Sequence, residues 1–203
     1  MTLRIAHRGD PRGFRENTLP AIEGGVAAGA DLVEVDVRVT ADGHAVLLHD
    51  PTLERLWGDP RAVSALTLRD VREVAAASGG WEIPTLDAAL DLAEDLDTEL
   101  MLDVTSVPIA LATEDVVRAR GVRDRVVFCG DTAGLARVRE RDGGVRIALS
   151  WGPGPLPDAS VWDRVRPQFF NPEWIAVSEQ VVAEMHAAGR GVCTWTVDRP
   201  ADM

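Results

Sequence analysis

The chain has 203 residues, of which 46% are hydrophobic and 27% are charged, as is usual for a packed soluble domain. Its formal net charge of −12 argues against nucleic acid and anionic membrane surfaces as general partners, and lysine is absent, so all 21 strongly basic side chains are arginine. No basic-then-apolar leader precedes the first expected strand and no apolar run reaches about 18 residues, so we expect a cytoplasmic protein without a transmembrane segment.

Strand-like and helix-like segments alternate along the first half of the chain. Short apolar runs predict strands over residues 3–7, 31–40 and 44–50. Helix-start signals ahead of apolar-periodic runs predict helices that begin after Thr18, Thr67 and Thr85.

The same alternation continues in the second half. The expected strands cover residues 100–105, 125–130, 145–150 and 191–197, with a short strand inside 167–174. The expected helices cover residues 113–121, 132–141 and 178–189, and a Gly/Pro loop covers 151–157. Without a repeat or an interdomain linker, this order favours one α/β domain over residues 1–203 with a parallel sheet, either a barrel or open.

The two cysteines are not candidates for chemistry. Cys129 and Cys193 are far apart in the chain and fit no metal or redox spacing. We therefore expect both to be small buried thiols.

Candidate site residues gather where the expected strands end, which in α/β folds is the edge at which ligands bind. Glu34 and Asp36 lie two residues apart in one strand, on the face opposite a stripe of valines at 33, 35, 37 and 39. The other candidates near strand ends are His7, Arg8, Asp103 and Trp195.

His49 reaches the same edge through an expected hairpin. Only a few residues separate strands 31–40 and 44–50, which is too short for a helical crossover and predicts antiparallel pairing. With the turn centred on Asp42-Gly43, Asp36 would fall opposite His49, with their Cβ atoms about 5 Å apart. The sequence therefore predicts two histidines, three carboxylates and an arginine at the edge where the strands end, which we call the mouth.

Each candidate has an ordinary structural alternative when it is taken singly. A histidine after a strand is commonly a structural hydrogen-bonding group, and Arg8 could be a surface charge or a partner of Glu16. The carboxylates could face solvent or cap a segment, and Trp195 could be core. Taken together these alternatives are weaker, because valine-rich strands in a covered sheet have little reason to carry three carboxylates unless a cation or a cavity holds them.

Five segments carry a specific combination of motifs. They are AHRG at 6–9, ENTLPAI at 16–22, GADLVEVDVRVTADGHAVLLHD at 29–50, IPTLDAAL at 83–90 and GVCTWTVD at 191–198. In these segments the chain resembles the glycerophosphodiester phosphodiesterases of the phospholipase-C-like superfamily. The resemblance implies a (β/α)8 TIM-type barrel.

The resemblance also implies roles for the candidate residues. His7 and His49 are expected to be the general acid/base pair, and Arg8 is expected to contact the phosphate. Glu34 and Asp36 are expected to bind a divalent cation, with Asp103 as the third carboxylate; all-oxygen ligation favours Ca²⁺ or Mg²⁺ over zinc. Trp195, in the last matching segment, is expected to contact the substrate.

Two features depart from the family pattern. Where the family usually has Glu-Ile-Lys, this chain has Asp103-Val104-Thr105, so the carboxylate is one methylene shorter and a cation that would help neutralise the phosphate is absent. The chain also stops soon after the WTV segment, so we expect a barrel that lacks its last helix and closing strand, as in a shortened fragment.

The expected function is metal-dependent hydrolysis of glycerophosphodiesters, small-molecule substrates, to glycerol phosphate and an alcohol. One alternative keeps the fold but acts on lysophospholipids or another phosphodiester, which Thr105 and the loop 151–157 with Trp151 keep open. Another is a degenerate barrel that binds a phosphorylated ligand or a protein without catalysis, which the intact histidine pair opposes.

Overall fold

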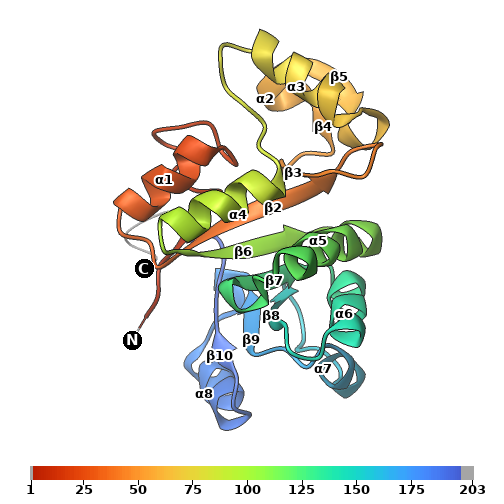
Figure 1. Ribbon diagram of the computed structural model, residues 1–203. Coiled ribbons are helices and arrows are strands. Elements are labelled where there is room, and N and C mark those ends of the chain that lie inside the picture. The colour runs from red at the N-terminus through yellow and green to blue at the C-terminus, as the bar shows by residue number, and fades with distance from the viewer. Residues whose placement is uncertain (1, 198–203) are drawn as a thin grey trace.

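The fold is built on one curled, mainly parallel sheet, seen in a computed structural model that describes residues 2–197 (Figure 1). The strand order is β1-β2-β6-β7-β8-β9-β10, and β3 pairs with β2 as an eighth strand. The strands are β1 (Ile5–His7), β2 (Leu32–Val39), β3 (Ala45–Leu47), β6 (Glu99–Val104), β7 (Val126–Gly130), β8 (Arg146–Trp151), β9 (Phe169–Pro172) and β10 (Gly191–Val192).

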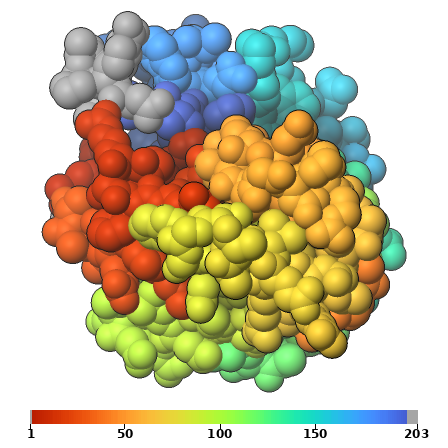
Figure 2. All heavy atoms as spheres, turned by 90° about the horizontal axis from the view of Figure 1, so that it is seen from above, coloured from red at the N-terminus to blue at the C-terminus, as the bar shows by residue number. Residues whose placement is uncertain are grey.

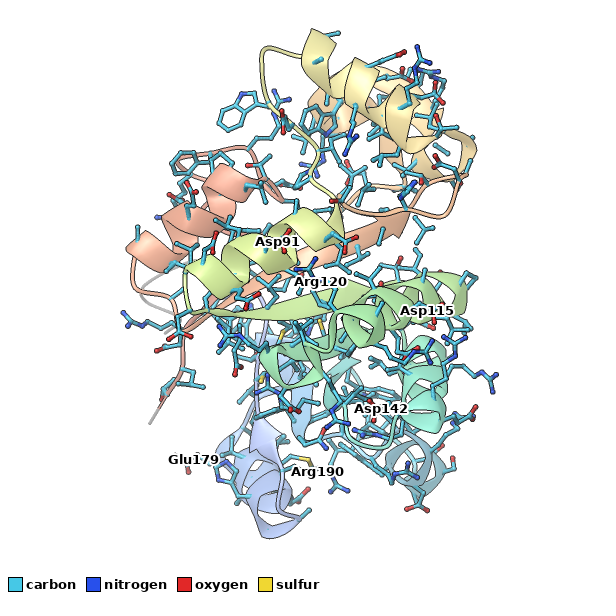
Figure 3. All side chains as sticks on the ribbon, in the orientation of Figure 1. Asp91, Asp115, Arg120, Asp142, Glu179 and Arg190 are labelled. Atoms are coloured by element: carbon cyan, nitrogen blue, oxygen red, sulfur yellow. The ribbon has the colours of Figure 1, made fainter. Side chains whose placement is uncertain are left out.

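Within residues 2–197, six helices accompany this sheet. They are α1 (Leu19–Ala27), α4 (Leu86–Asp95), α5 (Val107–Arg120), α6 (Thr132–Arg141), α7 (Ala159–Val165) and α8 (Glu179–Ala187). Neighbouring helices are joined by ion pairs, and Arg120 of α5 contacts Asp91 of α4 (Figure 3). No helix within residues 2–197 has the length and apolar character needed to cross a bilayer.

A small lobe is inserted after β3. It consists of β4 (Thr52–Leu53), α2 (Glu54–Trp57), β5 (Asp59–Ala62), a 3-10 turn at Val63–Ala65 and α3 (Leu68–Ala77). Its own apolar core includes Leu53, Trp57 and Val71. Seen from above, this lobe lies beside the segment that precedes α1 (Figure 2).

The two faces of the sheet have different cores. Three valines of the predicted stripe of β2, at 33, 35 and 37, pack with helix residues such as Ile22 and Leu86 in the outer core. The opposite face carries a second cluster of buried residues, Leu32, Met101, Val127, Cys129 and Ala148. Glu34 and Asp36 share this inner face, so the inner cluster forms an apolar floor beneath them.

The predicted alternation of strands and helices is confirmed, with differences at the element ends. The helix predicted over 113–121 begins at Val107, because Pro108 fits the first helical turn, and it ends at Gly121 in the left-handed region. Helix α7 and the lobe elements β4, α2 and β5 were not predicted, since each is short. The strand predicted over 191–197 is confined to Gly191–Val192.

The curvature of the sheet decides between the barrel and the open sheet in favour of the barrel type (Figure 1). Within residues 2–197, β10 pairs with β9 and no pairing joins β10 to β1. Asp198, the last residue of the WTVD segment, and the rest of the expected domain to residue 203 lie outside the described residues.

Candidate active site

The exit of β1 carries His7 and Arg8 into the site. His7 Nε2 lies 3.9 Å from Glu34 Oε2, and the Arg8 backbone N–H donates to the same carboxylate at 3.0 Å. Arg8 has a φ of 58°, and Gly9 follows with a φ of 81°. A Cβ on Gly9 would lie 2.3 Å from the carbonyl oxygen of Ala21, so only glycine fits this turn against α1.

Asn17 fixes the other end of this loop. It is buried and left-handed, with a φ of 59°, and its N–H donates to the Arg8 carbonyl at 3.1 Å. Its side chain bonds Asp36 twice: Nδ2 donates to Oδ2 at 2.7 Å, and Oδ1 accepts from the Asp36 N–H at 3.0 Å. The loop after β1 is therefore fastened to β2, and Thr18 caps α1 as predicted.

Three carboxylates meet at the carboxyl edge of the sheet. In the parallel pairing of β2 with β6, Asp36 lies opposite Asp103, and Glu34 lies one inner-face position earlier. One oxygen from each of Glu34, Asp36 and Asp103 lies within 4.8 Å of the others. This is an all-oxygen donor set of the kind that Ca²⁺ and Mg²⁺ prefer, so the residues present fit a hard divalent cation.

Burial and mutual repulsion make this cluster costly without a cation. Burial, followed by the charges of Asp36 and Asp103, raises the pKa of Glu34 well above its ordinary value. Burial and the neighbouring Asp36 raise the pKa of Asp103 from 3.8 to about 6. Arg38, His49 and Arg8 oppose the rise at Asp103 without cancelling it.

We expect the metal-free protein to become more stable as the pH falls from 7.5 to 5. The folded-state pKa of Asp103 lies above the unfolded value of 3.8, so the stability linked to its protonation is complete below about pH 4 and is lost as the pH rises through 6. Asp103→Asn should raise the free energy of unfolding at pH 7.5 by about 2 kcal/mol and flatten this pH dependence. Urea denaturation in EDTA at pH 7.5 and pH 5 measures the free energy of unfolding of wild type and variant. An equal change of this free energy with pH in the two proteins would contradict the expectation.

A chain of ion pairs links Arg8 to His49. Glu16 accepts from Arg8 Nη1 at 3.0 Å and from Arg55 Nη2 at 2.6 Å, and Arg55 Nε donates to Asp50 at 2.6 Å. Hydrogen bonding from Arg55 lowers the pKa of Asp50 to about 2, so this carboxylate is ionised at neutral pH. Asp50 Oδ1 lies 2.7 Å from His49 Nδ1, and because an ionised carboxylate only accepts, Nδ1 carries the hydrogen and Nε2 faces other partners.

The predicted hairpin is confirmed, but its register differs by one residue from the prediction. Val37 pairs with Leu47, and Leu48 donates its N–H to the Asp36 carbonyl at 3.0 Å, so Asp36 does not lie opposite His49. His49 follows the end of β3 in a bend, where strand alternation no longer sets the direction of a side chain. Its position at the site depends on side-chain contacts, not on cross-strand pairing.

Arg38 is a site residue that the sequence analysis did not single out. It follows Glu34 and Asp36 at the same two-residue spacing, which could have identified it. Its Nε donates to the His49 carbonyl at 3.0 Å, and its Nη1 donates to Thr105 Oγ1 at 2.7 Å. Burial lowers the pKa of Arg38, although Asp36 and other nearby carboxylates act in the opposite direction.

Trp195 lies at the far end of the same edge, with 38% of its surface exposed. A polar path crosses the strand ends between it and the carboxylates: Gly130 N–H and Asn171 Nδ2 both donate to Ser150 Oγ, and Trp195 Nε1 donates to the Asn171 carbonyl at 2.9 Å. A Cβ on Gly130 would lie 2.4 Å from Asp103 Oδ1, so glycine is required beside that carboxylate.

Three of the seven predicted site residues form the acidic cluster, and His7 and Arg8 contact it. His49 is close enough for its charge to act on Asp103, and Trp195 lies farther along the edge. The sequence analysis did not find Arg55. This residue lies in the inserted lobe, and its contacts to Glu16 and Asp50 depend on how the lobe packs against the first loop. Cys129 is buried as expected, and burial raises its pKa well above its ordinary value. Cys193 is only partly buried, which differs from the expectation, and burial raises its pKa to about 11.

Comparison with known proteins gives one consistent family. A family model described as the glycerophosphoryl diester phosphodiesterase family matches residues 7–203. The chain is 28% identical to a glycerophosphodiester phosphodiesterase of Caldanaerobacter subterraneus subsp. tengcongensis, over 100% of this chain and 88% of that protein.

Solved structures agree with this result. A protein from Silicibacter pomeroyi DSS-3 superposes with a TM-score of 0.85 at 26% identity, over 99% of this chain and 85% of that chain. A glycerophosphodiester phosphodiesterase from Thermotoga maritima gives a TM-score of 0.81 at 23% identity, over 100% and 89% of the two chains, which shows the fold. The predicted TIM-type fold class is thus confirmed.

Proposed function

The chain belongs to the glycerophosphoryl diester phosphodiesterase family, and we propose that it hydrolyses glycerophosphodiesters to glycerol phosphate and an alcohol with the help of a divalent cation. The predicted enzyme class, a phosphodiesterase, is confirmed at the level of the family. The observation that carries the proposal is the buried acidic cluster with a histidine beside it: His7 Nε2 lies 3.9 Å from Glu34 Oε2. His49 follows β3, which pairs with β2, and it is held by Asp50 and Arg38.

We propose that Glu34, Asp36 and Asp103 hold the cation, Ca²⁺ or Mg²⁺. When bound, such a cation would act as a Lewis acid on the phosphoryl oxygens. Arg8, fixed by Glu16 and by Asp36 at 3.2 Å, would lie beside the phosphate as a second positive group.

His7 and His49 would share the proton transfers. One imidazole accepts the proton of the attacking group, which is either the neighbouring glycerol hydroxyl or water. The other donates a proton to the oxygen of the departing alcohol as its bond to phosphorus breaks. An imidazole suits both steps because its ordinary pKa of about 6.5 lies near neutral pH. For His49 the transferring atom is Nε2, since Asp50 accepts from Nδ1.

A second candidate substrate class is supported by exposed hydrophobic side chains in the segments that follow three of the strands, which we call the apolar rim. The large hydrophobic side chains that are exposed within residues 2–197 include Leu156, Trp174, Ile175 and Trp195, which follow β8, β9 and β10. Such a rim would suit an alcohol or an acyl chain with apolar surface, as in a lysophospholipid. Trp195 would contact this part of the substrate.

A substrate panel tests the proposal. Purified protein with Ca²⁺ or Mg²⁺ is assayed for released alcohol with glycerophosphocholine, glycerophosphoethanolamine and lysophosphatidylcholine. We expect turnover of the glycerophosphodiesters, with kcat/KM at least tenfold above that for the lysolipid. Preference for the lysolipid would favour the second candidate, and binding without turnover of any substrate would favour the non-catalytic alternative.

We further propose a single catalytic domain over residues 1–203, since the family match covers residues 7–203. Location in the cytoplasm stays a prediction from the sequence.

A further inference from the structure

Arg38 stands directly above the acidic cluster in the strand pattern. Alternation along β2 puts it on the same face as Glu34 and Asp36, one step nearer the carboxyl end. Val37 of β2 pairs with Val104, the last residue of β6, so Arg38 and Thr105 come next on the two chains. The 2.7 Å bond from Arg38 Nη1 to Thr105 Oγ1 shows that their side chains meet. Arg38 and Thr105 thus form the layer between the carboxylates and the mouth.

Among the described residues Arg38 forms no direct ion pair with a carboxylate, and the charges of Asp36, Asp103 and Asp50 act on it only at longer range. Its Nε and Nη2 both donate to the His49 carbonyl and its Nη1 donates to Thr105, so within residues 2–197 its hydrogen bonds all go to neutral oxygens. These contacts use three of the five guanidinium N–H donors. Arg8 and Arg55, the other arginines at the mouth, each form ion pairs with two carboxylates.

The position next to Arg38 also lacks the cation that the family pattern has there. Thr105 stands where that pattern has lysine, and its hydroxyl accepts from the Arg38 guanidinium. A half-buried guanidinium with unused donors therefore occupies the region that a lysine at 105 would serve. Guanidinium donors suit phosphate oxygens, which accept such bonds in pairs.

We propose that Arg38 binds the phosphoryl group of the substrate and supplies the positive charge that Thr105 does not. The inference rests on the proposed function, because it assigns a phosphate to the same mouth. The competing explanation is structural: Arg38 holds only the backbone of His49, through the two bonds to its carbonyl.

Binding of sn-glycerol 3-phosphate, the product of the proposed reaction, separates these explanations without depending on turnover. Calorimetry with added Ca²⁺ compares wild type, Arg38→Gln, and Arg38→Gln combined with Thr105→Lys. The amide N–H of the Arg38→Gln variant can still donate to a carbonyl, but the charge is gone. We expect the single variant to bind 10- to 100-fold more weakly and the added Thr105→Lys change to recover at least tenfold.

Unchanged binding by Arg38→Gln would overturn the proposal, and so would weakened binding that Thr105→Lys does not recover. Arg137→Gln, an exposed arginine on α6, is the matched control and should bind as wild type does. If Arg38→Gln does not fold, as judged by circular dichroism, Arg38→Lys is used: the proposal expects affinity within tenfold of wild type, and a greater loss contradicts it.

The proposed function is tested separately by turnover. A wild-type protein that binds sn-glycerol 3-phosphate but hydrolyses no phosphodiester would contradict the function while leaving the Arg38 comparison valid. Normal wild-type turnover with unchanged Arg38→Gln binding would contradict only the role of Arg38.

Discussion

Alanine at either His7 or His49 is expected to lower kcat for glycerophosphocholine by about 10²- to 10⁴-fold, the range typical of a lost general acid or base. The two imidazoles come from different elements, so we expect that neither replaces the other: His7 ends β1 beside Glu34, and His49 follows β3 and is held by Asp50. Cation affinity should change little, because neither side chain belongs to the carboxylate set.

His44 provides a matched control for this experiment. It lies on the same hairpin as His49 but at the turn end, beside Asp42 at 3.8 Å and with about half of its side chain exposed. His44→Ala should retain wild-type turnover. Stopped assays with the three variants, together with calorimetric titration of Ca²⁺, measure both properties. Activity of His7→Ala or His49→Ala within tenfold of wild type would remove that histidine from the proposed mechanism.

Removal of the cation is the second change with a large expected effect. Treatment with EDTA should lower turnover by about 10³-fold or more, equivalent to roughly 4 kcal/mol of transition-state stabilisation, and Ca²⁺ or Mg²⁺ should restore it. Glu34→Gln should cause a similar loss that added cation does not reverse. The glutamine carbonyl can still accept the Arg8 N–H, so the loop after β1 keeps this bond in the variant.

Thermal unfolding measures cation binding through the melting temperature, independently of activity. A cation that binds only the folded state raises the wild-type melting temperature at pH 7.5, and the rise continues with the logarithm of the cation concentration above Kd. Glu34→Gln should melt higher than metal-free wild type, since the variant lacks a buried charge, and should gain little from Ca²⁺. Asp115→Asn, on the exposed surface of α5, is the control and should respond as wild type does (Figure 3). A rate that EDTA leaves unchanged would exclude the cation from the reaction.

The position of His49 shows how the site depends on neighbours that are distant in sequence. The Asp50 contact fixes its imidazole and Arg38 binds its carbonyl, while Arg55 connects Asp50 to Glu16 before α1. The lobe that contributes Arg55 also places Trp57 against Arg15, whose guanidinium carbon lies 4.5 Å from the ring centroid. The lobe and the first loop therefore support the site together (Figure 2).

Most of the element order, the α/β class and most of the candidate site could be predicted from the amino-acid sequence. Local rules sufficed there: Thr18 and Thr67 begin helices because their side chains cap the first turn, as the structure confirms. Strand alternation put Glu34 and Asp36 on one face, and the convergence of parallel strand ends brought Asp103 to them.

The register of the hairpin, the curvature of the sheet and the partners of the charged side chains depend on how the elements pack in three dimensions. Hairpin register is set by the geometry of the turn and by which face the rest of the fold buries, so the turn sequence alone did not distinguish Leu48 from His49 as the residue opposite Asp36. The guanidinium groups of Arg38 and Arg55 are long and flexible, and their partners lie up to 67 residues away in the chain. Such contacts depend on which elements pack side by side, which periodicity within one element does not specify.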